Sequence, residues 1–83
     1  MHGTVALINA DDALVAVETE HEEYTVMGVL DEDALAVGDT VEGDLEQLDY
    51  QVLDNTTQGT QVAVYIEDTE LTVDQAKEKM DLA

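Results

Sequence analysis

Several residue types are missing from this 83-residue sequence, and each absence excludes a kind of chemistry. There is no cysteine, so disulfides, thiolate metal sites and a cysteine nucleophile are excluded. There is no serine, so a Ser-His-Asp triad cannot form. There is no proline either, which is compatible with closely connected β-strands. Without any motif for catalysis, we expect no enzymatic activity and no cofactor.

Positive charge is also scarce. Asp and Glu number 21 against two basic residues, Lys77 and Lys79, and the formal net charge is −19. Nucleic acids and anionic membranes attract Lys and Arg, so neither bare nucleic acid nor a membrane is an expected partner. Two interpretations of the acidic surface stay open. It could bind cations or a basic patch on another protein, or it could only keep the protein soluble.

The length and the hydrophobic fraction are those of one small globular domain. Hydrophobic residues make up 45% of the chain, and no run approaches the roughly 20 apolar residues that span a bilayer. The start, Met1 to Thr4, lacks the basic region and apolar run of a secretory signal. The expectation is a soluble, cytoplasmic protein, with its oligomeric state left open.

Short runs rich in β-branched residues predict strands. Three of them span residues 4–9, 13–19 and 24–30, a fourth segment spans 40–52, and the last covers 61–67. The alternation within each run predicts which side chains are buried. These are Val5, Val15, Val17, Val26, Val41, Leu45, Val62, Val64 and Ile66.

The fourth segment changes phase. Its apolar positions are odd-numbered in residues 41–45 and even-numbered in residues 48–52, where Leu48, Tyr50 and Val52 continue the inward face. A pattern of period two changes phase only at an inserted residue or a break. We therefore expect a bulge or corner at Glu46-Gln47.

The C-terminal residues predict a short helix. Thr72 and Gln75 have the spacing of a capping box, which indicates a helix from about Val73 to Met80. Lys77 and Lys79 fall in its last turns, where the helix dipole favours cations. Its thin apolar stripe must be buried against the rest of the domain or against another chain.

These elements predict a mainly β domain over residues 1–83. It is a five-stranded, OB-like Greek-key barrel over about residues 3–67, with a short helix at about 73–80. The opening Gly3-Thr4-Val5 and the later segment 37–41 (VGDTV) resemble the first strand and the entry to the fourth strand of S1-like and cold-shock-like domains. The chain also resembles short stand-alone bacterial OB-like proteins of unknown function.

The resemblance implies binding of single-stranded nucleic acid through aromatic platforms and a basic groove. Three tyrosines, Tyr24, Tyr50 and Tyr65, are the aromatic residues, and the predicted barrel contains no Lys or Arg. Only Tyr24 stands on the second or third strand, where cold-shock-like domains carry a run of aromatics. The fold is therefore expected to carry over without the binding site.

The polar clusters give no strong indication of a metal site. Residues 31–33 (DED) offer oxygen ligands for Ca²⁺ or Mg²⁺ but lack the EF-hand pattern, and a solvated loop is expected there. A zinc site needs three or four convergent ligands. His2 and His21, with Glu20 or Glu22, could supply them only if the two ends of a hairpin met. We expect both histidines to be surface residues and no metal to be bound.

Tyr24 and Tyr65 are the candidate binding residues. Tyr65 points away from the inward side chains of its strand, so it could anchor a protein partner or cover apolar surface beneath the C-terminal helix; the second is favoured. The predicted function is a small, non-catalytic interaction module for a basic protein surface or cations. The alternative is a degenerate nucleic-acid-binding OB domain that acts within a complex. An acidic band around an exposed aromatic anchor would favour the first.

Overall fold

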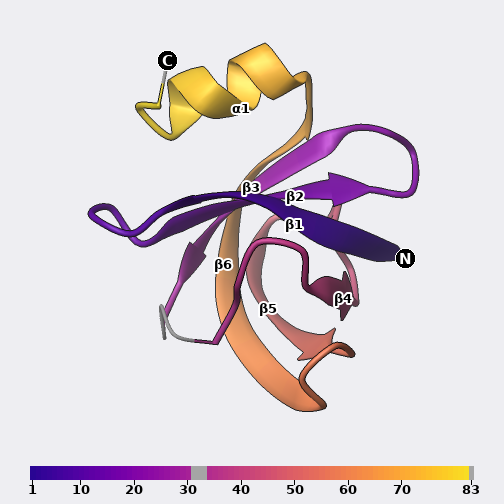
Figure 1. Cartoon of the computed structure of the whole chain (residues 1–83). Helices are drawn as coiled ribbons and strands as arrows, with labels where there is room; N and C mark the ends of the chain where they lie inside the picture. Colours follow the sequence, from indigo (N-terminus) through magenta and orange to yellow (C-terminus); the bar gives the residue numbers. More distant parts are fainter. Residues whose placement is uncertain (31–33, 83) are drawn as a thin grey trace.

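The computed structural model describes residues 1–30 and 34–82, which form a closed antiparallel barrel and one helix (Figure 1). The predicted mainly β barrel with a short C-terminal helix is confirmed. Within the described residues there are six strands rather than five. They are β1 (His2–Asn9), β2 (Leu14–Thr19), β3 (Tyr24–Val29), β4 (Thr40–Glu42), β5 (Asp49–Asn55) and β6 (Thr60–Leu71), and the helix is α1 (Val73–Lys79).

The strand order around the barrel is β1-β2-β3-β6-β5-β4, and β4 pairs with β1 to close it. Strands β1 to β3 follow one another as a meander, and the chain then crosses to β4, beside β1. A fourth strand that returns to the first in this way defines a Greek key. The helix α1 lies outside the barrel, above the strands in Figure 1.

The predicted fourth strand is in fact two strands. Strands β4 and β5 are separated by residues 43–48 and run antiparallel to each other, so the chain reverses where we predicted a corner. The inward assignment of Leu48, Tyr50 and Val52 is wrong, because these side chains are 50%, 57% and 50% exposed. Leu53 lies opposite Val62 on β6, and cross-strand partners share a face. The register with the buried side chains of β6 thus places Leu53 inside, and Asn55, which has the same parity, is also buried.

The barrel interior is formed by the residues that the alternation predicts. All nine residues expected to be buried are at most 3% exposed. Eight of them belong to one cluster together with Met27, Val29, Leu35 and Leu53. Val26 is the exception, because it is buried on the outside of the barrel, in a second cluster beneath α1.

The helix covers the outer face of the first strands. Its capping box is formed as predicted, with Gln75 N donating to Thr72 Oγ1 at 3.2 Å and Thr72 N donating to Gln75 Oε1 at 2.9 Å. Ala76 and Met80 are fully buried against the barrel, so this part of the apolar stripe packs within the chain, whereas Val73 and Leu82 are 38% and 43% exposed. Strands β1 to β3 are therefore apolar on both faces because one face lines the barrel and the other lies under α1.

A buried polar network fixes the connection that leads into β4. Asp39 Oδ2 accepts hydrogen bonds from Asn55 Nδ2 at 2.9 Å, Gln58 Nε2 at 2.7 Å and the Ala36 N–H at 3.1 Å. The bond from Asn55 contributes most to lowering the pKa of Asp39, the bonds from Gln58 and Ala36 add to it, and burial opposes them.

Gly3 lies where β1 approaches β2 most closely. A Cβ atom at this position would stand 2.6 Å from Val17 Cγ1 and 2.7 Å from the backbone oxygen of Glu18. Gly3→Ala is therefore expected to lower the free energy of unfolding by about 1–3 kcal/mol in urea denaturation. Gly28→Ala is the matched control, since Gly28 is also in a strand and its nearest neighbour is the flexible end of Glu67 at 3.3 Å. Equal losses in the two variants would contradict the steric explanation.

Candidate functional site

The outer face of β5 and β6 carries an uncovered group of apolar side chains. Tyr50 on β5 pairs directly with Tyr65 on β6, and Val52 pairs with Ala63. Tyr50, Val52 and Tyr65 are each at least half exposed, and Ala63 is half-buried. We call these four residues the Tyr50–Tyr65 face. The helix α1 packs on the outer face of β1 to β3 and not on these four residues.

The strand register brings the two tyrosines side by side. Residues directly opposite each other on antiparallel strands have Cβ atoms about 4.5–5.5 Å apart. On the other side of Tyr65, its partner on β3 is Gly28, which has no side chain. The space above Gly28 is taken by the end of the Glu67 side chain, whose Oε2 would stand 3.3 Å from a Cβ atom at this position. The face offers two adjacent aromatic rings at the barrel surface.

A hydrogen bond orients Tyr65. Its hydroxyl donates to Asp49 Oδ1 at 3.1 Å. This bond, and next the negative charge of Asp49, raises the pKa of Tyr65, with smaller contributions from burial and from Glu67. Asp49 has a φ of +77°, which is uncommon for a residue other than glycine. The first residue of β5 is thus held in an unusual conformation at the point where it contacts the tyrosine.

Carboxylates edge the Tyr50–Tyr65 face. Asp49 begins β5 and accepts the hydrogen bond from Tyr65, Asp54 lies near the other end of β5 on its outward side, and Glu67 follows Tyr65 on the outward side of β6. Asp54 also accepts a hydrogen bond from Gln61 Nε2 at 3.2 Å. No Lys or Arg occurs in the sequence before Lys77, so none of the strands contributes a positive side chain other than histidine. The arrangement is an aromatic centre within an acidic edge.

The two predicted site residues lie in different environments. Tyr65 is 51% exposed and belongs to the Tyr50–Tyr65 face. Tyr24 is half-buried and packs against the cluster beneath α1, so it occupies the position that the favoured interpretation gave to Tyr65. Burial, and next the charge of Glu18, raises the pKa of Tyr24. The structure does not bring Tyr24 and Tyr65 onto one face.

Sequence reasoning missed Tyr50 as a site residue because it placed Tyr50 inside the barrel. The opposite assignment was available in the sequence, since Leu53 is the apolar residue nearest the next turn and has the other parity. In the folded chain Asn55 is fully buried and satisfied by Ala34 O, Asp39 and Gln58 N.

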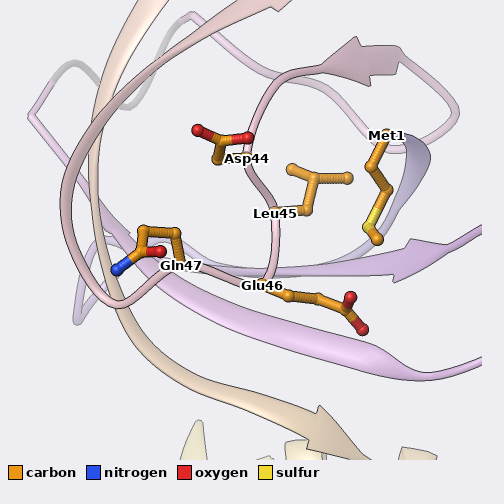
Figure 2. A pocket seen from close by; sticks show the side chains of 5 residues that line it. All are labelled: Met1, Asp44, Leu45, Glu46 and Gln47. Atoms are coloured by element: carbon orange, nitrogen blue, oxygen red, sulfur yellow. The ribbon is translucent and has the colours of Figure 1, made fainter.

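A shallow hollow of about 280 Å³ lies beside the connection between β4 and β5. Figure 2 shows its lining, in which residues 44–47 follow one another along the connection and Met1 lies next to them. The Gly43 N–H donates to Met1 O at 3.0 Å, which holds the N-terminus there. The polar groups of the lining are two carboxylates and one amide, Asp44, Glu46 and Gln47. The absence of enzymatic activity stays a prediction.

His21 lies near two carboxylates, Glu23, which is close to it in the sequence, and Glu46, which is not. His21 Nδ1 is 3.6 Å from Glu46 Oε2, and ligand atoms of His21, Glu23 and Glu46 all lie within 4.8 Å of one another. The carboxylates that the sequence suggested, Glu20 and Glu22, are not part of this cluster. The acidic segment 31–33, the other candidate for cations, lies outside the described residues.

Comparisons with known proteins give no match: no family model fits the chain, and neither the curated proteins nor the solved structures contain a significant relative. Within residues 1–30 and 34–82, no helix has the length and apolar character needed to cross a bilayer.

Proposed function

We propose that this protein is a small, acidic, non-catalytic interaction module that binds a basic surface of another protein through the Tyr50–Tyr65 face. The observation that carries the proposal is the pairing of two exposed tyrosines on neighbouring strands, with carboxylates at the edge of the pair. Tyrosine is among the residues that most often dominate binding energy at protein interfaces. Its ring is large and rigid, and its hydroxyl can form hydrogen bonds.

The acidic edge determines the class of partner. Opposite charges around an apolar contact accelerate association and exclude partners with the wrong charge. With a net charge of −19, the protein repels other acidic surfaces and attracts Lys- and Arg-rich ones. A basic segment with an apolar or aromatic residue at its centre would match both parts of this face.

The alternative function, nucleic-acid binding within a complex, receives less support. We interpret the barrel as OB-like because β1, β2 and β3 form a meander that is closed into a barrel by the later strands β4, β5 and β6. OB domains that bind single strands need aromatic platforms and positive charge. The ring of Tyr24 lies beneath α1, and the exposed rings of Tyr50 and Tyr65 have carboxylate neighbours. Both features favour a protein partner.

The test is capture of partners from native lysate with the tagged full-length protein, with and without nuclease. We expect basic proteins to be captured whether or not nuclease is present, and Tyr65→Ala or Tyr50→Ala to abolish their capture. Val37→Ala is the control, because Val37 is 64% exposed and lies outside the face. Capture that disappears with nuclease would support the alternative. Capture that survives both tyrosine substitutions would show that another surface is used.

The purified protein is expected to show no binding to single-stranded DNA or RNA at physiological salt. The reason is the absence of Lys and Arg before Lys77, because neutralisation of phosphates supplies most non-specific affinity. Fluorescence anisotropy with labelled oligonucleotides measures this directly. Micromolar binding that weakens steeply with added salt would contradict the prediction.

A further inference from the structure

We propose that His21, Glu23 and Glu46 form a binding site for a divalent transition-metal ion of the Zn²⁺ type. One ligand atom from each residue lies within 4.8 Å of the others, and His21 Nδ1 is only 3.6 Å from Glu46 Oε2. Three protein ligands with a fourth position for water or another group is an established zinc arrangement. The sequence led us to expect no metal here because it did not reveal that three donors converge.

The geometry is close to that of a coordinated ion. Ligands bound at about 2.0–2.1 Å in a tetrahedron lie roughly 3.3 Å from one another. The distance of 3.6 Å between His21 Nδ1 and Glu46 Oε2 is near this value. The other pairs of ligand atoms are at most 4.8 Å apart, so they need to approach each other by no more than about 1.5 Å to reach the tetrahedral spacing. Side chains at the surface can make such an adjustment by small rotations, since none of the three is fully buried.

The backbone positions that carry His21 and Glu23 are held in place. Both lie in the β2–β3 turn next to Thr19, which is 5% exposed. The Thr19 N–H donates to Glu23 O at 2.7 Å, and Thr19 Oγ1 accepts a hydrogen bond from the His21 N–H at 3.3 Å. A buried residue thus contacts both ligand-bearing residues of the turn, which limits the rearrangement that binding requires.

Glu46 is held from the other side of the site. It follows Leu45, which is fully buried in the barrel, and Leu45 O accepts a hydrogen bond from the buried Thr25 Oγ1 at 2.9 Å. The site therefore connects the β2–β3 turn to the connection between β4 and β5. An ion bound by all three side chains would cross-link two segments that are far apart in the sequence and stabilise the folded state by mass action.

The donor set selects the class of ion. Ca²⁺ and Mg²⁺ prefer ligand sets composed entirely of oxygen, whereas an imidazole nitrogen suits Zn²⁺ and its neighbours in the transition series. Two carboxylates balance the charge of a divalent ion. The net charge of −19 attracts any cation to the protein. A specific site is therefore distinguished from non-specific cation binding by its selectivity for Zn²⁺ over Ca²⁺.

The test is titration of the purified full-length protein with Zn²⁺, by calorimetry, in the presence of excess Mg²⁺ and Ca²⁺. We expect one saturable site, and we expect His21→Gln or Glu46→Gln to weaken its affinity at least about tenfold, which corresponds to about 1.4 kcal/mol. Glu22→Gln removes one carboxylate charge from the β2–β3 turn without removing a ligand, and His2→Gln removes the other histidine. Both controls are expected to stay within about threefold of the wild-type affinity.

A second measurement identifies the ligand directly. The protein has two histidines, so imidazole resonances in NMR spectra report on His21 and His2 separately. Zn²⁺ is expected to shift the ring signals of His21 and to leave those of His2 unchanged. The proposal is overturned if His21→Gln and Glu22→Gln have the same affinity, if Ca²⁺ competes equally with Zn²⁺, or if the His2 ring responds instead.

Discussion

Replacement of Ile66 by alanine is expected to lower the free energy of unfolding by about 2–5 kcal/mol. Ile66 is 1% exposed and belongs to the barrel core, where its β3 partner is the fully buried Met27. Truncation removes apolar contacts and leaves a cavity that a closed barrel cannot readily collapse. Urea denaturation followed by circular dichroism measures the loss. A domain of this size has limited stability, so Ile66→Val, with an expected loss of about 0.5–1.5 kcal/mol, provides a variant that stays folded.

The matched control for this experiment is Val52→Ala. Val52 is also an apolar residue of the same barrel, but it is 50% exposed on the Tyr50–Tyr65 face. Its truncation is expected to change the stability by no more than about 0.5 kcal/mol. A large loss at Val52 together with a small loss at Ile66 would contradict both the register of β5 with β6 and the location of the core.

Where local pattern and long-range packing agreed, the sequence was sufficient to predict the structure. The alternation in β6 placed Val62, Val64 and Ile66 correctly, and the capping box placed the start of α1 at Thr72. Both signals are local, because they depend on residues a few positions apart. The apolar stripe of α1 was also visible in the sequence, but its burial against the barrel was only one of two open possibilities.

The pattern failed in β5, and the failure coincides with the candidate site. A simple pattern would bury Tyr50 and Val52 and expose Asn55, whereas the structure does the opposite. The cost of burying Asn55 is offset by its hydrogen bonds to Asp39 Oδ2 and Ala34 O. Violations of local rules tend to occur where function requires them. The exposed tyrosine pair is the candidate binding site proposed above for this reason.

The cluster of His21, Glu23 and Glu46 could not be predicted for a different reason. Carboxylates are so frequent in this sequence that none stands out, and the partner of His21 comes from a distant segment. Only the reversal of the chain between β4 and β5 positions Glu46 near the β2–β3 turn. The spacing of residues along the chain holds no information on such a contact. The sequence therefore offered Glu20 and Glu22 as ligands and did not indicate Glu46.

The melting temperature is expected to rise by about 10 °C or more between about 0.01 M and 0.3 M NaCl at neutral pH. The dimensions of the molecule are 31 × 27 × 23 Å, which is close to the Debye length of about 30 Å at 0.01 M salt. At that salt concentration each carboxylate is repelled by charges across the whole molecule. At about 0.15 M the screening length falls to about 8 Å, and only near neighbours still interact.

The unfolded chain gains less from salt because its charges are already far apart. Repulsion in the folded state is also relieved when some carboxylates become protonated, so stability is expected to rise as the pH falls from about 7 to about 5. Differential scanning calorimetry over both variables measures these effects. A melting temperature that does not change with salt or pH would show that bound cations already compensate the charges. Removal of these cations with a chelator would then have to restore the dependence of the melting temperature on salt and pH.

Asp39 is expected to reverse this trend at lower pH. Its hydrogen bonds, the bond from Asn55 first, hold its pKa below the ordinary value, so the folded state favours its ionised form. The stability that Asp39 contributes is therefore complete above the unfolded pKa of about 3.9 and is lost as the pH falls through its lower folded pKa. The two opposing effects predict a stability maximum between about pH 4 and pH 5.

Asp39→Asn separates the two effects, because it keeps the shape of the side chain and removes the titrating group. The variant is expected to be less stable than the wild type between about pH 5 and pH 7, since an amide is a weaker acceptor for the Asn55 and Gln58 donors than a carboxylate. Below about pH 4 the wild type loses this advantage, and the two melting curves should converge. Asp54→Asn serves as the control, because Asp54 is exposed and lies outside the network. A difference between wild type and Asp39→Asn that stays constant down to about pH 2.5 would show that Asp39 is not the group whose protonation weakens the fold in acid.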